Sequence, residues 1–175
     1  LGLHANPIKR LPMELSDLHL KLNVLTLTST SNWEMPTQSI ISQGRAKILE
    51  FLGQISQGIS KRSINISNED ISAVYIDDNR FKSNLVQLNC SENRIGSWPS
   101  GIFLCGKLEK VNLKSNCIMS IPSDISQLKL LEFLDLSFNS LSTIPECIGI
   151  LSSLNSLLLE HNNIQTLPET LSTLQ

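Results

Sequence analysis

A segment of 18 residues occurs four times in this chain at a constant spacing of 23 residues, starting at Leu85, Leu108, Leu131 and Leu154. An Asn and a Pro recur at fixed positions of every copy: Asn93, Asn116, Asn139 and Asn162, and Pro99, Pro122, Pro145 and Pro168. Repeats of this length fold as units that stack along one axis, because one unit cannot bury its own apolar face. The sequence therefore predicts a stack of repeats with one continuous core.

Each copy follows the pattern L-x-x-L-x-L-x-x-N-x-L-x-x-L-P-x-x-I-x-x-L. Two apolar residues separated by one, such as Leu134 and Leu136, have the period of a strand, so both side chains should point inward. The Asn is expected at a bend, where its amide can bond backbone groups that the turning chain leaves unpaired. The Pro is expected to start the return arc, where no ladder hydrogen bond is needed.

Weaker copies precede these four. Residues 63–75 place Ile64 and Ile66 on a strand, with Glu69 at the Asn position, 24 residues before Asn93. Two further copies start at Leu1 and at Leu22, and the second is degenerate. We therefore expect about seven repeats in total, interrupted once.

The interruption lies between Leu27 and Ile66, where the chain holds about 16 residues more than one repeat needs. Its apolar residues have the spacing of an amphipathic helix: Ile41, Ile48, Leu49, Leu52 and Ile55. We predict a helix at 45–56 that closes the first block of repeats, with Gly58 as its stop and 58–62 as a linker. The predicted division is a first block at 1–39, a helix and linker at 40–62 and a second block at 63–175. Two separate solenoids and one horseshoe with an insert both fit this division.

The repeat pattern resembles the leucine-rich repeat family in its short intracellular class. The resemblance implies an α/β solenoid, or horseshoe, with a parallel sheet on its concave face. The tail from Ile40 to Leu52, followed by a restart from Lys82, is similar to members that carry two blocks. The family resemblance implies an interaction protein of the cytoplasm or nucleus, with no catalytic residues to transfer. Because the chain starts inside a repeat and stops at Gln175 where a strand should begin, we expect it to be a fragment.

Charge and composition argue against several partners. The formal net charge is −2 and 17% of the residues are charged, so nucleic acid and anionic membranes are not expected. No apolar run approaches the ~20 residues of a membrane span. The repeat phase places Cys90 and Cys105 inside and Cys117 and Cys147 outside, which favours free thiols in a reducing compartment. An intracellular, cytoplasmic location is expected, with the nucleus as an alternative.

The sequence lacks the residue patterns of the common catalytic and metal-binding sites. The segment Gly53–Gly58 has two glycines at the spacing of a phosphate loop, but Ile59 stands where Lys is required. His4, His19 and His161 lack metal-ligand spacing, and residues 77–79 read as a solvated turn. We therefore expect no enzyme activity, no cofactor, no metal and no small-molecule substrate.

Binding is expected on the outward positions of the strands, which span roughly 20 Å because neighbouring strands lie ~4.8 Å apart. The candidate partner-binding residues on this concave face are Lys110, Asn112, Lys114, Phe133, Asp135, Phe138, Leu158, Glu160 and His161. The favoured function is a non-catalytic scaffold that binds another protein there. The alternative is the recognition segment of a larger signalling enzyme, a kinase or GTPase whose catalytic domain lies outside this chain. An extracellular receptor ectodomain is disfavoured because cysteine-rich caps are absent from the sequence.

Overall fold

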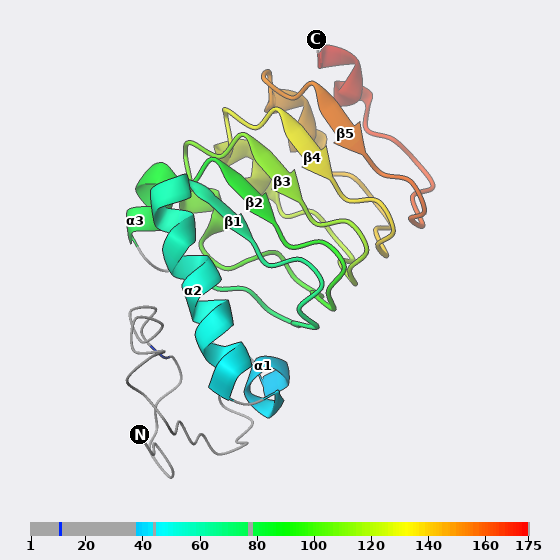
Figure 1. Ribbon diagram of the computed structural model, residues 1–175. Helices are drawn as coiled ribbons and strands as arrows, with labels where there is room; N and C mark the ends of the chain where they lie inside the picture. Colours follow the sequence, from blue (N-terminus) through cyan, green and yellow to red (C-terminus); the bar gives the residue numbers. More distant parts are fainter. Residues whose placement is uncertain (1–10, 12–37, 44, 77–78, 175) are drawn as a thin grey trace.

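The computed structural model describes Leu11 and residues 38–43, 45–76 and 79–174 (Figure 1). Within these residues, five strands form one parallel sheet in sequence order: β1 (Ser63–Asn65), β2 (Gln87–Asn89), β3 (Lys110–Asn112), β4 (Phe133–Asp135) and β5 (Ser156–Leu158). Equivalent repeat positions pair across the sheet, as Val111 pairs with Leu134 and Leu134 with Leu157. The α/β solenoid and the repeat phase predicted from the sequence are confirmed for these five repeats.

The return arcs lie on the other side of each coil and contain 3-10 helices. These are η2 (Ile102–Leu104), η3 (Ser123–Gln127), η4 (Glu146–Ile150) and η5 (Glu169–Thr173). Pro122, Pro145 and Pro168 stand directly before the last three, each with an extended backbone. Proline favours this place because it fixes φ and needs no hydrogen-bond acceptor. Its predicted role at the start of the return arc is therefore confirmed.

The core runs the length of the solenoid between the strands and the arcs. The inward strand residues Leu88, Val111 and Leu134 are buried, as are Leu113 and Leu136. Leu157 and Leu159 of the last repeat are only half-buried and pack against this core from one side. Each repeat thus covers the apolar face of the one before it, as expected for a stack in which only neighbours touch.

The recurring asparagines hold neighbouring coils together. The Asn116 side-chain Oδ1 accepts a hydrogen bond from the Ile95 N–H at 2.9 Å. Its Nδ2 donates to the carbonyls of Cys90 and Leu113, both at 3.0 Å. Asn93, Asn139 and Asn162 make the equivalent bonds in their own repeats. The predicted role of these amides, to satisfy backbone groups at the bend, is confirmed.

A helix covers the end of the sheet at β1. α2 (Arg45–Lys61) packs against β1 and is preceded by the short α1 (Gln38–Ser42) (Figure 1). The predicted helix at 45–56 was too short, because α2 continues to Lys61 and includes all but the last residue of the predicted linker at 58–62. Gly58 does not stop it: a Cβ there would lie 2.9 Å from Ile64 Cγ1, so the glycine allows close contact with β1.

The charged residue at the asparagine position of the first described repeat bonds to this helix. Glu69 is buried, and its carboxylate lies 2.6 Å from Nζ of Lys47 on α2. The hydrogen bond to Glu69 raises the pKa of Lys47, against the opposing effect of burial. Gln54 of α2 donates a longer bond of 3.5 Å to the same carboxylate. Glu69 therefore bonds to α2 on the side where Asn93 and Asn116 bond to a preceding repeat.

Two further sequence expectations concern the start of the chain and residues 77–79. The predicted first repeat block at 1–39 lies outside the described residues, apart from Leu11 and the start of α1. Asn79, expected in a solvated turn, instead begins α3 (Asn79–Asn84). Phe81 of α3 is buried in the core, which gives this short helix its apolar anchor.

Candidate partner-binding face

The exposed face of the sheet carries two rows of side chains. The first, here called the outer row, consists of Ser63, Gln87, Lys110, Phe133 and Ser156, which are register partners on successive strands. The second, here called the turn row, consists of Asn65, Asn89, Asn112, Asp135 and Leu158 at the ends of the same strands. Strict register places equivalent side chains side by side, so each row forms a line across the sheet.

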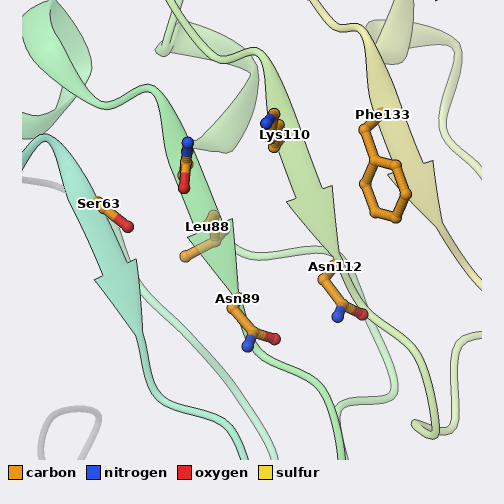
Figure 2. A pocket seen from close by; sticks show the side chains of 7 residues that line it. Ser63, Leu88, Asn89, Lys110, Asn112 and Phe133 are labelled. Atoms are coloured by element: carbon orange, nitrogen blue, oxygen red, sulfur yellow. The ribbon is translucent and has the colours of Figure 1, made fainter. Parts of the chain in front are cut away.

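A hollow of about 190 Å³ lies on this face across β1 to β4. Its lining consists of Ser63, Gln87, Leu88, Asn89, Lys110, Asn112 and Phe133 (Figure 2). Three of the nine candidate residues, Lys110, Asn112 and Phe133, therefore lie together. The candidate set omitted Ser63, Gln87 and Asn89, although each has the same repeat position as one of those three.

The turn row has a structural role that the sequence interpretation missed. The side-chain oxygens of Asn89, Asn112 and Asp135 accept the backbone N–H two residues on, at 3.1, 3.0 and 2.9 Å respectively. This local bond is the Asx turn, which stabilises a chain that leaves a strand. Asp135 is only 7% exposed, so it offers a partner little surface. Leu158 has no side-chain acceptor, and the last repeat lacks this bond.

Three candidate residues form a second cluster just beyond the ends of the strands. The Lys114 ammonium lies 5.4 Å from the centroid of the Phe138 ring. Phe138 stacks on His161 with ring centroids 4.2 Å apart. A cation above an aromatic ring and two offset rings each contribute about 0.5–1 kcal/mol at an exposed site. The neighbouring Glu160 is exposed, so the edge of the cluster carries charges of both signs.

The aromatic rings of this cluster stand at backbone positions of positive φ. Phe138 has a φ of 56° and His161 of 53°, and the equivalent residues Asn68, Glu92 and Ser115 share this conformation. The left-handed conformation costs a residue with a side chain on the order of 1 kcal/mol. The chain thus holds Phe138 in a strained conformation with 43% of its surface exposed. The positive φ is shared by the equivalent residues of the other described repeats, so its exposure is the feature that makes Phe138 a candidate for contact with a partner.

The cysteine thiols lie as the repeat phase predicted for the interior. Cys90 and Cys105 are buried and free, while Cys117 is exposed and Cys147 half-buried. Burial raises the pKa of the Cys90 thiol well above its usual range and that of Cys105 to about 11. Both thiols therefore stay protonated at neutral pH, which makes them poor nucleophiles.

The described part of the chain lacks both a cluster of metal ligands and a membrane-spanning helix. Within it, no group of three or more His, Cys, Asp or Glu side chains could hold a metal ion. No helix among those residues is long and apolar enough to cross a membrane.

Comparisons with known proteins agree with this architecture. Residues 83–141 match the family described as Leucine rich repeat. No curated protein sequence gives a significant match to the chain. A leucine-rich repeat protein of Leptospira interrogans is 21% identical with a TM-score of 0.55, over 69% of this chain and 37% of that one. This likeness supports the fold alone.

Two further solved structures are more similar in sequence. An internalin of Listeria monocytogenes is 29% identical with a TM-score of 0.52, over 65% of this chain and 32% of its own. A chain of the BIR3–SERK2 complex from Arabidopsis thaliana is 31% identical with a TM-score of 0.54, over 62% of this chain and 61% of its own. This chain therefore spans less than two thirds of the length of each of these three structures.

The fold and its exposed strand face define an α/β solenoid of the kind that typically serves as a non-catalytic interaction module. Residues 83–141 match the leucine-rich repeat family, and the described residues have the fold of a leucine-rich repeat solenoid.

Proposed function

We propose that this chain is a non-catalytic scaffold that binds a protein partner on the concave face of the sheet. The observation that carries the proposal is the hollow across β1 to β4, with the exposed Lys110 and the aromatic Phe133 in its lining. Aromatic and cationic side chains at the rim of a hollow are common anchors in protein interfaces. The Arabidopsis structure is described as a complex of two proteins, which supports partner binding by similar repeats.

The nine candidate residues contribute unequally to this proposed surface. Lys110, Asn112 and Phe133 line the hollow, while Lys114, Phe138 and His161 form the stacked cluster beyond the strands. Leu158 and Glu160 extend the surface toward β5. Asp135 acts mainly through its charge, because its side chain is buried.

We further propose that the protein works inside the cell, in the cytoplasm or nucleus. Two free and buried thiols, Cys90 and Cys105, fit a reducing compartment. The order of a helical tail and a restart at Lys82–Val86 resembles leucine-rich repeat-containing protein 40, and we propose this relationship as the finer assignment.

Affinity capture from cell lysate tests the binding proposal. The wild-type chain is compared with a Lys114→Glu, Phe138→Asp double variant, after equal thermal melts have shown that both are folded. We expect a partner that the wild type retains and the variant loses at least about tenfold, because the variant reverses one charge and removes one aromatic anchor. Equal capture of the same partner by both proteins would contradict binding at this face.

A further inference from the structure

Two of the polar side chains that line the hollow, Asn89 and Asn112, offer an occupant hydrogen-bond donors alone. Asn89 and Asn112 each use Oδ1 to accept a backbone N–H of their own turn. That bond fixes the orientation of each amide, so that its –NH₂ group remains available to donate a hydrogen bond to an occupant of the hollow. Neither Nδ2 has an acceptor within the described residues. Two fixed donors thus stand on neighbouring strands, facing whatever occupies the hollow.

Lys110 adds a positive charge to these donors. It is exposed, and no carboxylate in the described part of the chain lies within ion-pair distance of its ammonium. Among the described residues that line the hollow none is acidic, and Lys110 is the one that carries a charge. An occupant that matches this lining must be rich in acceptors and negatively charged.

The hydrogen-bond donors and the positive charge of the hollow end at β4, where Phe133 and Asp135 take the equivalent positions. Phe133 is the register partner of Lys110, so an aromatic ring stands one strand spacing, ~4.8 Å, from the cation. Asp135 is the register partner of Asn112 and replaces its amide donor with a carboxylate. The face therefore changes between β3 and β4 from a surface that attracts anions to one that is apolar and negatively charged.

We propose that the hollow binds an extended acidic peptide segment of the partner. The inference rests on the proposed function and specifies its partner. A carboxylate of the segment lies on Lys110 and the amide of Asn112, and an apolar side chain packs on Phe133. Side chains on one face of an extended chain recur every two residues, roughly 6.6 Å, which is the same-face spacing nearest to the ~4.8 Å between the backbones of Lys110 and Phe133. The expected motif is therefore an acidic residue and an apolar residue separated by one other residue.

Two matched variants test the charge preference without disturbing the fold. Asn112→Asp and Asp135→Asn both keep the oxygen that accepts the turn N–H. The first turns a donor in the hollow into a negative charge, and the second removes the negative charge at its border. Each position thus serves as the structural control for the other.

The probe is a phage-displayed library of random dodecapeptides selected on the wild-type chain, and the enriched sequences are then measured as synthetic fluorescein-labelled peptides. We expect enrichment of the acidic–apolar motif. Asn112→Asp should weaken these peptides at least about tenfold, and Asp135→Asn should tighten them a few-fold. Failure of the library to enrich, enrichment of neutral or basic peptides, or equal affinity for Asn112→Asp and wild type would each overturn the inference.

The same peptides separate this inference from the proposed function. Neutral or basic peptides that the Lys114→Glu, Phe138→Asp variant no longer binds would overturn the acidic preference while leaving binding at this face intact. Peptides that bind equally to that variant, to Asn112→Asp and to the wild type would overturn both.

Discussion

Leu136→Asp should unfold the repeats around β4 at physiological temperature. Leu136 is fully buried in the core of the solenoid. An aspartate there would place a charge among apolar side chains with no partner, at an expected cost of at least about 4 kcal/mol. Because each repeat is covered by its neighbours, the loss should spread to the repeats on either side. Thermal melting followed by circular dichroism measures the effect.

Leu130→Asp provides the matched control, since Leu130 lies six residues earlier and is 48% exposed. The same substitution on this exposed leucine should change the free energy of unfolding by no more than about 0.5 kcal/mol. If Leu136→Asp melted like the wild type, the repeat phase would be wrong.

Asn116→Ala should produce the second large loss of stability. Its amide bonds the Ile95 N–H and the carbonyls of Cys90 and Leu113 inside the solenoid. Alanine would leave the Ile95 N–H without a partner. The Cys90 and Leu113 carbonyls would each lose one of two bonds and keep the bonds from Asn93 and Asn139, so the expected total cost is about 2 kcal/mol. Urea denaturation measures the change, and the exposed Asn155 supplies a control in Asn155→Ala. Equal midpoints for the two variants would show that the amide ladder does not hold the coils together.

The strands and the asparagine ladder could be predicted because their signal is local and repeated. Alternation of Leu134 and Leu136 fixes which side chains point inward, and four copies in phase leave one consistent register. The prolines predicted where each return arc starts for the same reason, but the sequence did not predict that the arcs are 3-10 helices. The helical stripe ending at Ile55 likewise predicted α2, although not its length.

Contacts between segments that lie far apart in the sequence could not be predicted from the repeat pattern. Gly58 was expected to stop a helix because glycine commonly does so, but its role depends on the approach of Ile64. The sequence showed only that Glu69 takes the position of the Asn. The structure shows that its carboxylate pairs with Lys47 on α2. Such pairings are set by tertiary structure.

The sequence predicted where the candidate residues lie, but not the hydrogen bonds and ring contacts that they make. The outward columns identified Lys110, Asn112 and Phe133, which the structure brings together in one hollow. The sequence could not show that a side-chain oxygen of Asn112 and of Asp135 accepts a backbone hydrogen bond within its own turn. Nor could it reveal the stacking of Phe138 on His161, because ring orientation depends on the strained backbone of the bend.

Lysine footprinting of the chain with its captured partner tests the central claim most directly. Acetylation rates are compared for the free chain and for the complex, with mass spectrometry to assign each site. We expect Lys110 and Lys114 to be protected in the complex, while the exposed Lys107 and Lys129, which follow η2 and η3, react as in the free chain. Protection of Lys107 and Lys129 with unchanged reaction at Lys110 and Lys114 would contradict the claim that the strand face binds the partner.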